Sequence, residues 1–200
     1  MRGKFLVLYG VNRVGKSAQQ KLLAHYLESQ GHNVETIKYP IYDVVPSGRY
    51  LNAILRKGAR KDISTEEMQL WYTINRHQFQ SQLTKMLESG TWVLSEDYIG
   101  TGIAWGMVEG ADIEWLETIN QFLVPSDFEI LLDGPSFPSS RETGHRHEDN
   151  DELLGKARRS HLNLAKRYNW PIIAANQPPD KVHAQIVNLV MTRLLLGNSR

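Results

Sequence analysis

The stretch Gly10-Val11-Asn12-Arg13-Val14-Gly15-Lys16-Ser17 matches the pattern G-x-x-x-x-G-K-[ST], which is typical of loops that bind nucleotide phosphates. The apolar run Phe5 to Tyr9 precedes it, and apolar residues recur after it at helical spacing until Gly31. The sequence therefore predicts a buried strand, a phosphate loop and an amphipathic helix in succession. A simple glycine turn before a helix is the alternative, and the context on both sides favours the phosphate loop.

The residue types in this loop suit a bound triphosphate and its metal ion. The backbone N–H groups of the loop and of the helix N-terminus would hold the phosphates. Lys16 would reach the β- and γ-phosphates, and Ser17 would ligate Mg²⁺. The phosphate-binding set that we predict consists of Gly10, Asn12, Arg13, Val14, Gly15, Lys16 and Ser17.

Composition excludes several classes of protein. A chain of 200 residues with 41% hydrophobic content can bury one sizeable core, so we expect a single domain over residues 1–200. The 23 basic and 22 acidic residues nearly cancel, which argues against nucleic acid or an anionic membrane as the main partner. The absence of cysteine excludes disulfides, thiolate metal sites and cysteine nucleophiles. Neither a signal peptide nor a membrane-spanning run is evident, so we expect a soluble cytoplasmic protein.

Apolar strands alternate with amphipathic helices along the whole chain. This pattern predicts an α/β fold of three layers, with a parallel, five-stranded sheet covered on both faces. The expected strands are 5–9, 34–39, 92–94, 128–133 and 170–174. The expected helices are 18–30, 47–58, 64–90, a short one around 103–105, 113–123, 153–168 and 182–196.

Ligands of such sheets bind outside the carboxyl ends of the strands. We therefore expect the phosphate loop to share one crevice with the residues that follow the other strands: Tyr39, Pro40, Glu96, Asp97, Asp133 and Asn176. Carboxylates at the end of the strand 92–94 suggest coordination of Mg²⁺ or water. The polar segment at about 135–153 has little apolar material to anchor it and is interpreted as a mobile lid. Its His145 and His147 are interpreted as solvated residues rather than metal ligands.

From Phe5 to about Leu196 the chain resembles the thymidylate kinase family, nucleoside monophosphate kinases that pass the γ-phosphoryl group of ATP to dTMP. Beyond the phosphate loop, Tyr39-Pro40 resembles the family's Phe-Pro, and Asn75-Arg76 resembles its Asn-Arg. The stretch Glu96-Asp97-Tyr98-Ile99-Gly100-Thr101-Gly102-Ile103-Ala104-Trp105 is similar to its Asp-Arg-Tyr-x-x-Ser-x-x-Ala-Tyr segment, and Arg146-His147-Glu148 resembles the Arg-Tyr-Glu of its lid.

The resemblance implies a P-loop kinase fold, ATP and Mg²⁺ as cofactors, nucleotides as small-molecule partners and a homodimer. It implies that Tyr72 stacks on the base, that Arg76 hydrogen-bonds the base O4 atom and that Thr101 places a hydroxyl nearby. An ordinary core aromatic beside Trp71 is the alternative for Tyr72, and the pairing with Arg76 favours the site. Lys16, Arg13, Glu96 and Arg146 would be catalytic, Arg141 would be a second lid cation, and Ser17 with Glu96 would hold the metal.

Three departures concern the acceptor side. Asn12 stands where the family has an aspartate that contacts the sugar 3′-hydroxyl. Glu96-Asp97 replaces the Asp-Arg pair, and Tyr42 replaces the arginine two residues after Phe-Pro, so both expected clamps for the acceptor phosphate are absent. Arg49, Lys38 or Arg60 would supply the missing charge with Tyr42 donating a hydrogen bond, or Asp97 would bind Mg²⁺ or a sugar hydroxyl. The predicted acceptor set is Asn12, Tyr39, Tyr42, Arg49, Tyr72, Arg76, Asp97, Tyr98, Thr101 and Trp105.

Three functions are consistent with these residues. The first is phosphoryl transfer from Mg·ATP to a pyrimidine deoxynucleoside monophosphate, dTMP to dTDP above all. The second is a deoxynucleoside kinase in which Glu96 or Asp97 serves as base or hydroxyl ligand. The third is a nucleotide-binding switch or pseudokinase that orders its lid without transferring phosphate.

Overall fold

Five parallel strands form one sheet in the order β2-β3-β1-β4-β5. The computed structural model describes residues 1–57, 62–135 and 151–195. The strands are β1 (Phe5–Tyr9), β2 (Val34–Lys38), β3 (Trp92–Glu96), β4 (Phe128–Asp133) and β5 (Ile172–Ala174). The predicted α/β class and the parallel, five-stranded sheet are thus confirmed.

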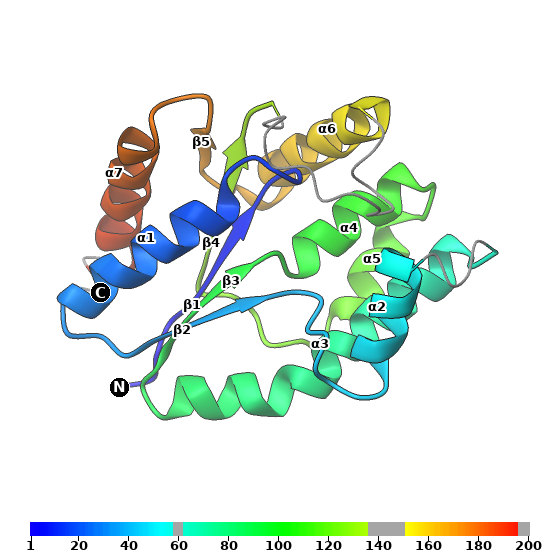
Figure 1. Ribbon diagram of the computed structural model, residues 1–200, viewed down its shortest axis with the longest axis horizontal. Coiled ribbons are helices and arrows are strands. Elements are labelled where there is room, and N and C mark those ends of the chain that lie inside the picture. Colours follow the sequence, from blue (N-terminus) through cyan, green and yellow to red (C-terminus); the bar gives the residue numbers. More distant parts are fainter. Residues whose placement is uncertain (58–61, 136–150, 196–200) are drawn as a thin grey trace.

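Helices cover both faces of the sheet (Figure 1). They are α1 (Lys16–Ser29), α2 (Ser47–Lys57), α3 (Thr65–Glu88), α4 (Ile99–Val108), α5 (Ile113–Asn120), α6 (Asp151–Tyr168) and α7 (Pro179–Val190), followed by the π-helix η2 (Met191–Leu195). Helices α1 and α7 lie next to each other on one side, while α3, α4 and α6 lie on the other. The result is the three-layer arrangement that the alternating pattern predicts.

The central strand β1 shows why its sequence is apolar without interruption. Phe5, Val7 and Tyr9 pack into the core cluster that includes α3 and α4, and Leu6 and Leu8 pack into the cluster that includes α1 and α7. Successive side chains of a strand point to opposite faces, so a strand covered on both sides needs apolar residues at every position. The phosphate loop therefore begins from a rigid, fully buried strand.

The glycines after β3 lie inside α4, whereas the sequence predicted a helix only around 103–105. A Cβ atom on Gly100 would collide with the Trp170 and Tyr9 rings, and one on Gly102 would collide with the Arg76 guanidinium. These glycines permit close packing of the helix and do not mark a loop. Helix α4 thus reaches back to the end of β3 and brings its first turn against Arg76.

Other boundaries differ modestly from the sequence prediction. Strand β3 continues through the buried Ser95 and Glu96, and the last helix begins at Pro179 and ends as the π-helix η2. The predicted start of the long helix is confirmed, because the Ser64 side chain accepts a hydrogen bond from the Glu67 N–H. No helix within the described residues has both the length and the apolar composition that crossing a lipid bilayer requires.

Candidate active site

The phosphate loop joins the carboxyl end of β1 to the first turn of α1. Gly10 has a φ of 143°, and a Cβ atom there would meet the Leu132 carbonyl oxygen and the Val14 side chain, so only glycine fits. Val11 and Val14 are buried in the core and anchor the loop. Gly15, with a φ of 102°, caps α1 without a side-chain hydrogen bond, so the N-terminal N–H groups of the helix remain available to an anion.

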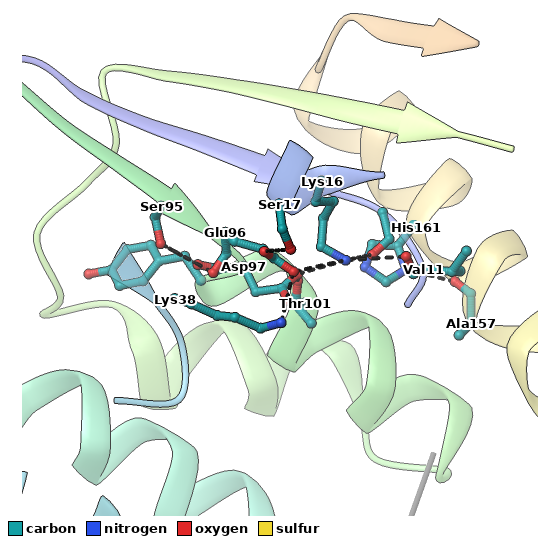
Figure 2. A network of polar contacts seen from close by, with 12 residues as sticks. Val11, Lys16, Ser17, Lys38, Ser95, Glu96, Asp97, Thr101, Ala157 and His161 are labelled. Carbon is teal, nitrogen blue, oxygen red and sulfur yellow. Dashed lines mark hydrogen bonds and ion pairs between the residues drawn. The ribbon is translucent and has the colours of Figure 1, made fainter. Parts of the chain in front are cut away.

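Lys16 is 3% exposed and lies at the centre of a polar network (Figure 2). Its Nζ donates to the carbonyl oxygens of Gly10 at 2.7 Å and Val11 at 3.2 Å. The same nitrogen lies 3.9 Å from Glu96 Oε1 and 3.6 Å from Asp97 Oδ1. Lys16 is thus held by the loop itself and faces the two carboxylates at the end of β3.

Glu96 and Asp97 are adjacent buried carboxylates with opposite electrostatics. Burial alone would raise the pKa of Glu96, but Lys16, Lys38 and the Ser17 hydroxyl together lower it below its ordinary value. Burial raises the pKa of Asp97, and Glu96 raises it further, against the lowering effect of Lys16. Glu96 therefore loses its proton at a lower pH than Asp97 does.

Asp97 is oriented by its own neighbours. Its φ is 64°, in the left-handed region that aspartate tolerates better than most residues, and the Thr101 hydroxyl donates to its Oδ1 atom at 2.7 Å. Lys38, which is largely exposed, places its Nζ 3.0 Å from Glu96 Oε1. Four cationic or hydroxyl groups thus converge on the carboxylates from β2, α1 and α4, as Figure 2 shows: Lys38, Lys16, Ser17 and Thr101.

The donor set at this point fits Mg²⁺. The Ser17 hydroxyl donates to Glu96 Oε2 at 2.5 Å, which places two hard oxygen ligands beside the phosphate loop. No group of three or more histidine, cysteine, aspartate or glutamate residues that could hold a metal occurs among the described residues. A Mg²⁺ ion here would rely on one or two protein oxygens and on substrate phosphates, which is its usual preference.

One large cavity of about 1220 Å³ extends from the phosphate loop along the sheet edge to α3. Its lining includes most of the predicted donor and acceptor residues: Asn12, Arg13, Gly15, Lys16, Ser17, Tyr39, Tyr42, Tyr72, Arg76, Glu96, Asp97, Tyr98, Thr101 and Trp105. Residues as far apart in the sequence as Asn12 and Trp105 therefore line the same cavity. The cavity lies at the carboxyl ends of β1, β2 and β3, where ligands of parallel sheets bind.

The acceptor half of the cavity is walled by aromatic side chains that the structure holds in place. Tyr39 is buried, and its ring lies 5.0 Å from that of Tyr98. The Tyr98 hydroxyl donates to the Val124 carbonyl oxygen at 3.0 Å. Asn75 donates to and accepts from the Ile41 backbone at 2.8 Å, which fixes the loop after β2 against α3. The wall is therefore preorganised.

Arg76 lies at this wall, and part of its guanidinium is already hydrogen-bonded within the protein. Its Nη1 donates to Asn120 Oδ1 at 2.9 Å, its Nη2 donates to the Tyr98 carbonyl oxygen at 3.0 Å, and its Nε is buried with no partner among the described residues. Burial lowers the pKa of Arg76. A base in the cavity would meet the remaining N–H groups of a guanidinium that is already oriented.

Three of the residues predicted to face the crevice do not line this cavity. Arg49 is exposed and is not among the residues that line the cavity, because the part of α2 at the cavity lies seven residues, or about 10 Å, further along the helix. Asp133 and Asn176 do not line it either. The Asp133 carboxylate instead accepts two hydrogen bonds from Arg158, at 2.7 and 2.9 Å.

Several predicted residues lie outside the described part of the chain. These are Arg60, Arg141, His145, Arg146 and His147, together with most of the segment 135–153 that was interpreted as a lid.

Sequence reasoning missed three residues that the structure brings to the site. Arg56 from α2 lines the cavity, Asn120 from α5 holds Arg76, and His161 from α6 lies beside Lys16 (Figure 2). Only Arg56 carried a local signal, as a cation at the end of an amphipathic helix. The other two depend on packing between distant elements and had none.

The buried His161 is expected to make the stability of the fold depend on pH. Burial lowers its pKa from 6.5 to about 4, and the Lys16 charge adds to the lowering. The unfolded chain therefore binds the proton first as the pH falls, so the stability present above pH 6.5 is lost between 6.5 and about 4. We expect a loss of up to about 3 kcal/mol in the free energy of unfolding.

Urea denaturation at intervals from pH 7 to 4 measures this loss. His161→Leu should flatten the profile in that window, whereas the exposed His25→Gln should leave its slope unchanged. An equally steep profile in His161→Leu would contradict the prediction.

Comparisons with known proteins agree with this geometry. A family model described as thymidylate kinase matches residues 8–186. A protein of Thermococcus kodakarensis named "Probable thymidylate kinase" is 33% identical over 203 residues, covering 95% of this chain and 98% of the relative. A protein of Pyrococcus abyssi with the same name is 34% identical over 205 residues, covering 98% and 99%. The structure of thymidylate kinase from Candida albicans superimposes with a TM-score of 0.83 at 22% identity, covering 96% of this chain and 92% of that one, which supports the fold.

Proposed function

The chain belongs to the thymidylate kinase family, and from that premise we propose that it transfers the γ-phosphoryl group of ATP to dTMP, giving dTDP and ADP. The observation that carries the proposal is the single cavity in which the phosphate loop, the Glu96-Asp97 pair and the Tyr72-Arg76 wall face one another. A donor and an acceptor phosphate bound at its two ends would meet near the carboxylates, as in-line transfer requires.

On the donor side, the N-terminus of α1, which no side chain caps, supports binding of the triphosphate. Lys16, oriented by the Gly10 and Val11 carbonyls, would exchange its contacts with the loop for the β- and γ-phosphates. Arg13 lines the same cavity and would offset charge that develops on the phosphoryl group in flight. The roles of Arg141 and Arg146 as cations that arrive on closure remain part of this proposal.

Ser17 and Glu96 would hold Mg²⁺ together with the phosphates. When bound, the ion would neutralise negative charge on the phosphate oxygens. The lowered pKa of Glu96 keeps its carboxylate ionised and able to ligate a cation. Lys38 and Lys16 would balance the remaining negative charge of the pair.

On the acceptor side, Tyr72 would stack on the pyrimidine and Arg76 would donate to its exocyclic oxygen. Asn12 and Asp97 line the cavity and would hydrogen-bond the sugar hydroxyl, with Asp97 oriented by Thr101. Tyr39, Tyr98 and Trp105 would close the pocket around the sugar and base.

The test is product analysis with dTMP, dUMP, dCMP and thymidine as acceptors, each with ATP and Mg²⁺, by chromatography of the nucleotides. We expect dTDP from dTMP at a rate well above the ATPase background. Preferential phosphorylation of thymidine would instead establish a nucleoside kinase. ATP-induced thermal stabilisation with no product from any acceptor would establish a nucleotide-binding switch.

A homodimer and a cytoplasmic location belong to the same proposal. Helix α3 exposes Leu70 at 44% and Ile74 at 40%, one turn apart on one face, which supports pairing of two copies through this helix. Sedimentation velocity would measure the oligomeric state.

A further inference from the structure

The acceptor half of the cavity needs a cation for the phosphate dianion of a nucleoside monophosphate. The described residues that line the cavity include five with positive charge: Arg13, Lys16, Lys38, Arg56 and Arg76. Arg13 and Lys16 belong to the phosphate loop and would face the donor. Among the described residues that line the cavity, the candidates for the acceptor cation are therefore the other three.

Two of these three lie next to other groups, which give them a different role. Lys38 lies 3.0 Å from the Glu96 carboxylate, at the donor end of the cavity. Arg76 is buried and donates to Asn120 and to the Tyr98 carbonyl, beside the aromatic wall that would hold the base. Arg56 is the remaining candidate.

Arg56 is held over the ring of Tyr42. The Cζ atom of its guanidinium lies 4.9 Å from the ring centroid, and both residues line the cavity. Stacking of this kind orients a guanidinium while leaving its N–H edge available to a second partner. Among the described residues no carboxylate forms an ion pair with Arg56.

The surrounding structure fixes both members of the pair. Leu51, Ile54 and Leu55 bury one face of α2 in a core cluster with Met68 of α3. Gly48 packs so closely on the Tyr42 carbonyl oxygen that a Cβ atom there would collide with it. The helix and the loop that carry the pair are therefore packed in place, and the stacking on Tyr42 orients the exposed Arg56 side chain at the cavity.

We propose that Arg56, stacked on Tyr42, binds the 5′-phosphate of the acceptor nucleotide. The proposal deepens the proposed function and rests on it for the identity of the acceptor. It explains how a chain with Tyr42 and Asp97 in place of two arginines can still take a phosphorylated acceptor: a helix supplies the cation, and the aromatic residue in the loop orients it.

The experiment compares dTMP with thymidine, which lacks the phosphate. Calorimetry should show that Arg56→Met weakens dTMP binding about 30-fold and leaves thymidine binding unchanged, since the loss of a charge-assisted contact to phosphate is of that order. KM for dTMP should rise in parallel while KM for ATP stays constant. Arg56→Lys should recover part of the loss, because it keeps the charge without the planar fork.

Variants of Tyr42 test the stacking of Arg56 on its ring. Tyr42→Phe keeps the ring and should change dTMP affinity less than threefold, and Tyr42→Leu should weaken it about fivefold. Tyr42→Arg in the Arg56→Met background should restore dTMP binding by placing a cation in the loop. Circular dichroism melts of every variant verify that each one folds.

Several results would overturn the proposal. They are unchanged dTMP binding in Arg56→Met, an equal loss of thymidine binding, or a larger effect from Arg49→Met on the same helix. If the wild-type protein binds dTMP but produces no dTDP, the proposed function fails, while the binding comparison still tests the role of Arg56.

Discussion

Replacing Lys16 with methionine is expected to lower kcat for dTDP formation by about a thousandfold, the cost of removing a preorganised charge from a developing phosphoryl transition state. Methionine keeps the length and apolar stem of the side chain, which is 3% exposed, so packing changes little. The Nζ contacts to the Gly10 and Val11 carbonyls disappear with the charge. Steady-state turnover with saturating ATP and dTMP measures the effect.

The matched control is Lys21→Met, which removes a lysine from the exposed face of the same helix. It should retain wild-type turnover, since Lys21 does not line the cavity. A Lys16→Met enzyme within tenfold of the control would contradict the assignment of Lys16 to the donor phosphates.

Lys16→Met should also make stability depend more steeply on pH. Lys16 is the strongest influence that lowers the pKa of Asp97, which burial and Glu96 raise. Burial and Glu96 already hold this pKa above its ordinary value in the wild type, and without the lysine it should rise further. The free energy of unfolding should then fall more steeply as the pH rises through the range in which folded Asp97 loses its proton. Denaturation at pH 5 and pH 8 tests the sign.

The donor half of the site was predictable because its determinants are local. The loop from Gly10 to Ser17 carries its glycines, lysine and hydroxyl at fixed spacing, and strand β1 before it is apolar at every position. Local spacing dictates which backbone N–H groups and side chains face a phosphate. Consequently the predicted strand 5–9 and the predicted loop coincide with the structure.

The acceptor half was less predictable because it depends on distances between elements. Arg49 and Arg56 lie on nearly the same face of one helix, and only the position of α2 against the cavity distinguishes them. The predicted helix around 103–105 likewise began too late, because the reason for Gly100 and Gly102 lies in residues that are distant in the sequence. The role of these glycines is to admit the Arg76, Tyr9 and Trp170 side chains, which no local pattern shows.

Arg76→Met is expected to destabilise the fold and to weaken the acceptor site at once. The substitution removes the shorter of two hydrogen bonds at each buried acceptor: Asn120 Oδ1 keeps only the Thr73 hydroxyl at 3.4 Å, and the Tyr98 carbonyl oxygen keeps only the Gly102 N–H at 3.4 Å. The cost should be about 2 kcal/mol. Relief of the buried charge offsets part of this cost, as the lowered pKa of Arg76 indicates. Urea denaturation measures the net effect.

A double variant separates folding from binding. Arg76→Met with Asn120→Leu replaces both members of this pair by apolar groups, which should restore part of the stability because the acceptor that lost its shorter hydrogen bond is removed as well. The KM for dTMP, expected to rise at least tenfold in Arg76→Met, should stay high in the double variant. Recovery of KM together with stability would show that Arg76 acts only through the fold.

Gly102→Ala tests the packing of Arg76 against α4 by changing the α4 residue instead of the arginine. In a helix, alanine is favoured over glycine by about 1 kcal/mol, so an isolated site would become more stable. Here the added Cβ atom collides with the Arg76 guanidinium, which is held between Asn120 and Tyr98 and has little room to move. We therefore expect a loss of stability and a raised KM for dTMP in Gly102→Ala. In the Arg76→Met background the same alanine should become neutral or stabilising, because the flexible thioether can yield where the guanidinium cannot. That reversal of sign would locate the cause of both effects in the fixed position of Arg76 rather than in the helix.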